Sequence, residues 1–257
     1  MTKTAWYIGC KADEVGDSAI LIGDPGRIPR IAKVLERSTL LEEKRGLRTV
    51  TGWRKGRRIT ATAFGMGAPI ATIVLQELRE LGVHTFLRIG TAQVVPPAVL
   101  GDFVLADGAM RVEGTSGTFA PAGYPAIADF DLNTALRKRL AESRRRSHAG
   151  VFATYDGFYS QMFVIAEGQR RVVDELREDI QRYRILATDM ETSALLTVGR
   201  LIGARVSSLC MGTVDALTQA VLPMEKQAIC EQEMFAIALD SLASLPPPAA
   251  KTKDSNS

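Results

Sequence analysis

The sequence predicts an α/β fold in which short apolar strands alternate with helices. The chain repeatedly runs from strand through turn to helix, and the segments 18–23, 84–90 and 204–214 are almost continuously apolar. Such runs are typical of strands that are buried on both faces of a sheet. A chain of 257 residues is long enough for one large domain with a sizeable core. We expect this domain to span residues 1–245 and to be followed by a disordered tail, 246–257.

The composition excludes several classes of function. Hydrophobic residues make up 46% and charged residues 24%, and the net charge is only +3, too small to indicate nucleic acid or an anionic membrane as a partner. We find neither a signal-peptide pattern nor an apolar run of about 18 residues. Three distant cysteines and two histidines predict reduced thiols in a cytoplasm, and they argue against a metal cage or a Ser-His-Asp triad.

The stretch Gly65–Thr91 is the strongest indication of a functional site. It reads as a glycine turn, a helix from Ala68 to the C-cap Gly82, and a strand that ends near Arg88. An arginine at the end of a buried strand would cost several kcal/mol if it were unpaired. Open α/β sheets bind ligands at this edge. Arg88 is therefore predicted to meet a bound anion; the alternatives are a partner carboxylate and an arginine that extends to the surface.

Two further turns carry charged residues in suitable places. Asp24-Pro25-Gly26-Arg27 follows the strand 18–23, where free backbone N–H groups and a guanidinium could bind phosphate. Glu191 lies in the first turn of a helix that runs to about Leu201, where the helix dipole favours an ionised carboxylate. Such a carboxylate can accept hydrogen bonds from two neighbouring hydroxyls, as on a ribose. An ordinary βα turn and an ordinary first-turn acid are the alternatives.

The other elements are predicted from apolar periodicity and turn residues. We expect a hairpin at 47–64, a strand with a bend at 101–114, a long loop at 115–130, a short strand at 150–154 and an aromatic loop at 155–161. We expect further helices at 31–36, 131–143, 166–181 and 223–242.

Several motifs occur together in a fixed order. They are Gly23-Asp24-Pro25 with Arg27, Gly65-Met66-Gly67, Arg88-Ile89-Gly90-Thr91, the loop 119–130 and Met190-Glu191. With these motifs the chain resembles the nucleoside phosphorylases of the hexameric class over roughly residues 5–240, and it looks most like bacterial uridine phosphorylases. The resemblance implies a three-layer α/β/α fold with a twisted mixed central sheet that partly closes on itself. It also implies a homo-oligomer, with dimers that assemble into a hexamer.

The resemblance also implies a role for individual residues. Phosphate would be bound by Gly23, Arg27, Arg88 and Thr91, with Arg45 lent by a neighbouring subunit. Tyr7, Met190 and Glu191 would contact the ribose, and Phe158 and Gln161 the base. Arg88, Glu191 and Asp215 are the candidate catalytic residues, and Asp215 is placed near the aspartate acid of purine-selective relatives. No metal or organic cofactor is expected, and inorganic phosphate is the co-substrate.

Three departures from the family pattern bear on specificity. Tyr7 stands where the family usually has a histidine, Asp189 replaces a glutamate, and no arginine follows Gln161 at the spacing that reads uracil. The predicted activity is reversible phosphorolysis of a ribonucleoside to free base and ribose 1-phosphate, with uridine or a related pyrimidine nucleoside as the substrate. The alternatives are a purine nucleoside phosphorylase, a nucleosidase and a non-catalytic nucleoside-binding protein.

Overall fold

The computed structural model describes residues 2–246. All but the first residue of the expected disordered tail, 246–257, therefore lie outside the described residues. Within the described part of the chain, every helix is too short or too polar to cross a membrane.

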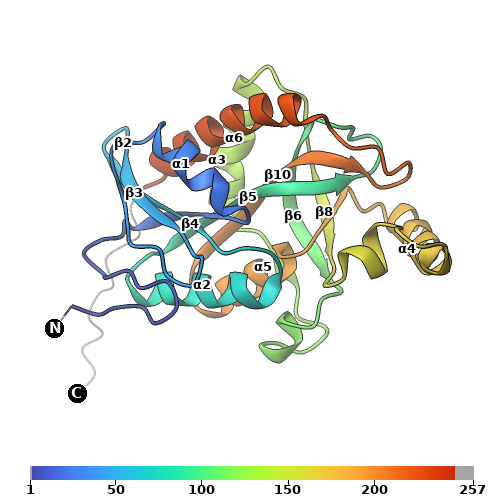
Figure 1. Cartoon of the computed structure of the whole chain (residues 1–257), viewed down its shortest axis with the longest axis horizontal. Coiled ribbons are helices and arrows are strands. Elements are labelled where there is room, and N and C mark those ends of the chain that lie inside the picture. The colour runs from blue at the N-terminus through green and yellow to red at the C-terminus, as the bar shows by residue number, and fades with distance from the viewer. Residues whose placement is uncertain (1, 247–257) are drawn as a thin grey trace.

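A mixed sheet forms the centre of the molecule (Figure 1). Within residues 2–246 its ten strands are β1 (Ser18–Ile22), β2 (Glu36–Leu40), β3 (Thr49–Arg54), β4 (Arg57–Ala63), β5 (Thr85–Val94), β6 (Phe103–Arg111), β7 (Ala126–Ile127), β8 (Ser147–Thr154), β9 (Ala187–Asp189) and β10 (Arg205–Asp215). Their order is β10-β6-β8-β9-β5-β1-β4-β3-β2, with β7 paired to β6.

Strand β5 is where the sheet closes on itself. One edge of β5 pairs in parallel with β10 along its whole length. The other edge pairs in parallel with β1 in its first half, and on that edge Gln93 and Val94 pair with the antiparallel strand β9. Because β10 also pairs with β6, the strands β5, β10, β6, β8 and β9 form a ring, from which β1, β4, β3 and β2 extend. The predicted mixed sheet that partly closes on itself is confirmed.

Helices cover both faces of this sheet, as the resemblance implied. Helices α1 (Ile28–Ala32), α3 (Phe130–Glu142) and α6 (Met224–Ser244) lie on one face, and α2 (Ala68–Glu80) and α5 (Thr192–Leu201) on the other (Figure 1). One buried cluster joins Leu136 and Phe235 to Ile20 of β1, and a second joins Val74 and Leu195 to Leu21. Successive residues of β1 thus pack against the helices on opposite faces of the sheet. The three-layer α/β/α prediction is confirmed.

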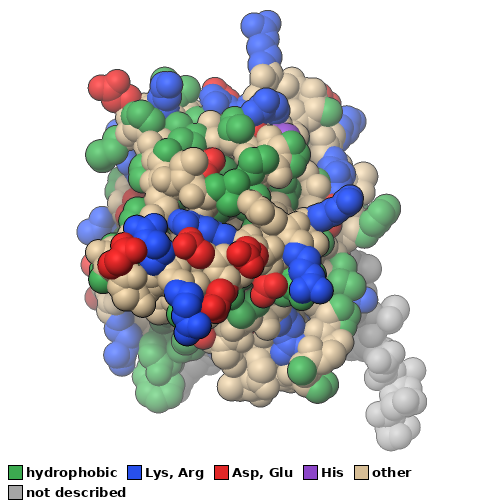
Figure 2. Space-filling view, turned by 90° about the vertical axis from the view of Figure 1, so that its right-hand side faces the viewer, with side chains coloured by type: hydrophobic (Ala, Val, Ile, Leu, Met, Phe, Trp, Pro, Cys, Tyr) green, Lys and Arg blue, Asp and Glu red, His purple; other side chains and the backbone are tan. Residues whose placement is uncertain are grey.

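Helix α4 (Arg170–Arg182) lies at the end of the molecule away from β2 (Figure 1). The described part of the face that carries it shows cations and anions interspersed (Figure 2). Along α4, Arg171 lies 3.5 Å from Glu175, and Arg177 lies 2.8 Å from Asp174. Exposed pairs of this kind contribute little to stability, so their effect is to keep this face mixed in charge.

At the start of the chain one predicted helix was wrong in its bounds and one strand was missed. Helix α1 covers Ile28–Ala32 rather than 31–36, and residues 36–40 form the edge strand β2. Every residue of β2 is exposed and its sequence, ERSTL, has no apolar alternation, so the periodicity that marks a half-buried strand is absent.

Two predicted loops and one predicted strand have more structure than expected. The aromatic loop contains a π-helical turn, Phe158–Met162, and β5 continues four residues past Gly90. The long loop 115–130 is held by Arg111, whose guanidinium donates to four of its backbone carbonyls, those of Ser116, Ala120, Pro121 and Tyr124.

We predict that Gly199→Ala destabilises the fold, because a Cβ at this position would lie 2.1 Å from Val206 Cγ2 where α5 packs on β10. The free energy of unfolding, measured by denaturant titration, should fall by about 1–3 kcal/mol from overpacking, although alanine favours helix by about 1 kcal/mol. In a Val206→Ala background the same change should cost much less. An equal loss in both backgrounds would contradict the contact.

Candidate functional site

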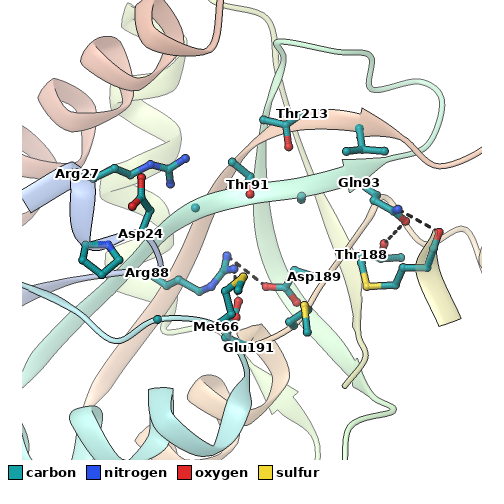
Figure 3. A pocket seen from close by; sticks show the side chains of 18 residues that line it. Asp24, Arg27, Met66, Arg88, Thr91, Gln93, Thr188, Asp189, Glu191 and Thr213 are labelled. Atoms are coloured by element: carbon teal, nitrogen blue, oxygen red, sulfur yellow. Dashed lines mark hydrogen bonds and ion pairs between the residues drawn. The ribbon is translucent and has the colours of Figure 1, made fainter. Parts of the chain in front are cut away.

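A cavity of about 450 Å³ lies where the parallel strands end (Figure 3). Its wall is built from the turn after β1, the turn after β4, the middle of β5, the segment after β9 and the end of β10. The carboxyl edge of such a sheet presents backbone N–H groups and loop side chains to a ligand. Segments that are distant in the sequence therefore meet in one place.

Arg88 is the most deeply placed cation of this cavity. It lies in β5 opposite Leu21 of β1 and Ser208 of β10, and only 5% of its surface is exposed. Its Nη2 pairs with Glu191 Oε2, and its Nη1 lies 3.2 Å from Asp189 Oδ2. Burial opposes the charge, but Cys210, Asp189 and Glu191 outweigh it, so the pKa of Arg88 is raised. Arg88 therefore stays positively charged.

Glu191 joins three elements at the cavity wall. It is the N-cap residue of α5, it pairs with Arg88 of β5, and its Oε1 accepts a hydrogen bond of 2.7 Å from the backbone N–H of Gly67. Gly65 and Gly67 have φ angles of +88° and +98°, a conformation that favours glycine. The Gly65-Met66-Gly67 motif thus aims a backbone donor at the carboxylate.

Asp189 fixes the start of helix α5. Its Oδ1 accepts from Thr154 Oγ1 at 2.8 Å, and its Oδ2 accepts from Thr192 Oγ1 at 2.5 Å and from the Thr192 N–H at 3.1 Å. The carboxylate is buried, and these donors together with Arg88 satisfy it. Asp189 therefore positions both Arg88 and the helix that carries Glu191.

Gly90 leaves room for the guanidinium of Arg88. The two residues lie on the same face of β5, two positions apart. A Cβ on Gly90 would lie 2.9 Å from Arg88 Nη1 and 3.1 Å from Cζ. The glycine of the Arg88-Ile89-Gly90-Thr91 motif is thus required by the path of the arginine side chain.

Arg27 lines the same cavity and lies above Arg88 in the view of Figure 3. Its Nε forms an ion pair of 2.6 Å with Glu231 Oε2. Glu231 belongs to α6, is 5% exposed, and its Oε1 lies 2.7 Å from Arg30 Nε. Sequence reasoning missed Glu231, because no local pattern links a residue of the last helix to the first turn of the chain.

Six of the predicted site residues line this one cavity. They are Gly23, Arg27, Arg88, Thr91, Met190 and Glu191. They come from the turn after β1, from β5 and from the segment after β9.

The other five predicted residues lie elsewhere within residues 2–246. Arg45 is exposed, and its guanidinium lies 5.1 Å from the ring centroid of Tyr7. Phe158 stacks on Phe163, and Gln161 Oε1 accepts from the Gly157 N–H. Asp215 Oδ1 accepts from the Leu217 and Thr218 N–H groups at 3.0 and 2.8 Å, which closes the turn after β10.

A polar group that sequence reasoning missed lies at the other end of the cavity from Arg27 (Figure 3). Gln93 Nε2 donates to the Met162 carbonyl at 3.1 Å, and Thr188 Oγ1 donates to Gln93 Oε1 at 3.2 Å. The prediction ended the strand near Arg88, so Gln93 fell outside it. A polar residue inside the apolar run that follows Gly90 is the signal that could have found it.

The fold and this cavity define an α/β protein with two arginines and a fixed carboxylate at a sheet edge. The chain matches the Phosphorylase superfamily over residues 17–243 and belongs to that family. A uridine phosphorylase of Thermococcus kodakarensis is 32% identical over 225 residues, which cover 83% of this chain and 78% of that protein. A guanosine phosphorylase of Halorubrum lacusprofundi is 32% identical over 230 residues, 89% of each chain.

The structure is also similar to a solved member of the family. A crystal structure of uridine phosphorylase from Vibrio fischeri, complexed with 6-hydroxy-1-naphthoic acid, matches with a TM-score of 0.80 and 30% identity. The match covers 93% of this chain and 94% of that one.

We predict that Gly90→Ala destabilises the protein by about 1–3 kcal/mol, because the new methyl group overpacks against the guanidinium of Arg88. Unfolding in denaturant measures the change. Gly150→Ala in β8 is the matched control, since a Cβ there would make ordinary contact with Leu186 at 3.4 Å. If the two variants lose the same stability, Gly90 has no special relation to Arg88.

Proposed function

We propose that the protein is a nucleoside phosphorylase, which transfers the ribosyl group of a nucleoside to inorganic phosphate. The observation that supports this most is that Arg27 and Arg88 face one cavity beside Glu191. Two guanidiniums, one from the turn after β1 and one from β5, provide donors for an oxyanion. Membership of the Phosphorylase superfamily agrees with the same activity.

The phosphate would bind at the end of the cavity where Arg27 enters. Gly23 and Thr91 lie beside it, so backbone N–H groups and a hydroxyl add to the two arginines. Burial strengthens these charge-assisted hydrogen bonds relative to water. The anion would be held and oriented before the reaction begins, which lowers the entropic part of the barrier.

The ribose would lie against Met190 and Glu191. A carboxylate fixed by Arg88 and by the Gly67 N–H can accept from the 2′- and 3′-hydroxyls and present the anomeric carbon to the phosphate. A phosphate oxygen then bonds to this carbon as the bond to the base breaks, and the electron pair leaves with the base. The phosphate and Glu191 favour the positive charge that develops on the sugar.

The five predicted residues outside the cavity keep the roles that the resemblance implies. Arg45 and Tyr7 lie together on the surface, which suits residues lent to the site of a neighbouring subunit in a dimer or hexamer. Phe158 would approach the base. For Gln161 and Asp215, which accept from backbone N–H groups outside the cavity, the roles toward the base and as the acid rest on the resemblance alone. A cytoplasmic location, and a reaction without a metal or organic cofactor, remain predictions.

We propose uridine or a related pyrimidine nucleoside as the substrate, with a purine nucleoside such as guanosine as the second candidate. The named relatives of Thermococcus kodakarensis and Halorubrum lacusprofundi act on uridine and guanosine, respectively. Both bases carry a ring N–H beside a carbonyl group, whereas cytosine and adenine carry a ring nitrogen acceptor beside an amino group.

We expect base release from a panel of nucleosides to require inorganic phosphate and to yield ribose 1-phosphate. Arg88→Ala should abolish it, with a loss of at least about a hundredfold in kcat/KM, because an oriented cation is lost and Glu191 loses its partner. Chromatography of the free base measures its release by the wild type, with and without phosphate, and by Arg88→Ala. Equal release without phosphate would identify a nucleosidase, and binding without product would identify a non-catalytic nucleoside-binding protein.

We further expect Glu231→Gln to raise the KM for phosphate by about tenfold, equivalent to about 1.4 kcal/mol, while the KM for nucleoside changes little. The reason is that Glu231 holds Arg27 but is not among the described residues that line the cavity. Glu231→Asp should restore part of the loss. Glu233→Gln, on the same helix but paired with Arg145, is the control. A uniform drop in kcat with an unchanged KM for phosphate would count against this positioning role.

A further inference from the structure

We infer that Gln93 is the side chain that selects the base by reading its hydrogen-bonding edge. The inference rests on the proposed function, and it assigns to β5 a role that the resemblance placed on Gln161. Four features support it: the place of Gln93 in the cavity, its fixed orientation, its remaining hydrogen-bonding capacity and the engagement of Gln161 elsewhere.

Gln93 lies where a base would extend from the proposed phosphate and sugar sites. Figure 3 shows Arg27 at one end of the cavity, Glu191 below the middle, and Gln93 with Thr188 at the other end. Thr91 and Gln93 belong to the same strand, so the second lies about 7 Å beyond the first. One strand thus runs past the anion end and on to the base end.

The amide of Gln93 is held in one orientation. Its side chain is buried, and the Met162 carbonyl can only accept, so the group that faces it must be the NH₂. Thr188, the register partner of Gln93 on β9, donates to the amide oxygen. A rotated amide would place two carbonyl oxygens against each other and leave a buried polar atom unsatisfied, which is costly.

The two hydrogen bonds leave part of the amide unused. One N–H of Nε2 and one lone pair of Oε1 remain for a ligand. Side by side, they match a base edge that has a carbonyl beside a ring N–H, as in uracil, hypoxanthine and guanine. Because the amide is held, it cannot turn to suit the opposite pattern of cytosine and adenine. We therefore expect a preference for bases of the first kind.

Gln161 is less suited to this role in the described structure. Its Oε1 accepts a hydrogen bond of 2.9 Å from the Gly157 N–H, four residues earlier, and it is not among the described residues that line the cavity. Met162, the next residue, does line the cavity, and its backbone carbonyl holds Gln93. The aromatic loop would thus act on the base through Gln93.

The test compares kcat/KM for uridine with that for cytidine, and for inosine with that for adenosine, at saturating phosphate. We expect the wild-type enzyme to favour uridine and inosine. Gln93→Ala should lower kcat/KM for the favoured nucleosides at least tenfold. It should also bring the uridine-to-cytidine and inosine-to-adenosine ratios of kcat/KM closer to one, with the KM for phosphate unchanged. Thr188→Val, which keeps the shape but removes the hydroxyl that holds the amide, should also shrink the ratios.

Gln76→Ala on α2 is the matched control, since the half-buried Gln76 donates to the Thr72 carbonyl of its own helix and is not among the described residues that line the cavity. Unchanged ratios in Gln93→Ala, or a change in Gln161→Ala alone, would overturn the inference. If the wild-type protein releases no base at all, the proposed function fails by itself. The inference is then tested by calorimetric binding of uridine and cytidine to the wild type and Gln93→Ala, where equal binding preference would overturn it.

Discussion

The buried contact of one guanidinium with two carboxylates is the interaction on which the site depends. Arg88 comes from β5, Asp189 from β9 and Glu191 from the cap of α5. Burying such charges costs several kcal/mol each unless every polar atom finds partners. The two carboxylates have such partners: two threonines and a helix N–H surround Asp189, and a turn N–H binds Glu191, whereas Arg88 Nε has none among the described residues. Since buried ion pairs add little net stability, what this cluster supplies is a fixed geometry.

The closure of the sheet explains how a single strand serves the whole cavity. β5 has β10 as a neighbour along its whole length; on its other edge β1 pairs with the first half and β9 with Gln93 and Val94. That change of partner brings Thr188 opposite Gln93 and places the segment after β9 close to Arg88. If the ring were open, β5 would lose either β10 or β9 as a neighbour. The cavity is therefore a product of the ring of strands as much as of the turns that line it.

The sequence predicted those parts of the fold and site in which a local pattern of apolar residues indicates burial. Apolar runs identified β1, β5 and β10, and the position of Arg88 in one of them gave the right edge of the sheet. For Arg88, a partner carboxylate and a place beside a cavity proved compatible, because its guanidinium pairs with carboxylates and also lines the cavity. The alternative of a surface arginine was wrong, since only 5% of Arg88 is exposed. Pairings between distant segments were beyond reach, as with Glu231, 204 residues after Arg27. The exposed strand β2 gave no periodic signal.

The balance of charge around the cavity gives a physical reason for a lent arginine. Arg27, Arg30 and Arg88 lie among Asp24, Asp189, Glu191 and Glu231, three positive charges against four negative ones, and each arginine lies within 3.2 Å of a carboxylate. A phosphate dianion that enters such a set would gain little net attraction. Additional positive charge from outside would change this balance, and Arg45 is exposed, with its guanidinium over the ring of Tyr7. A subunit that carries its own neutralised arginines and one exposed arginine would bind phosphate well only when a second copy completes the site.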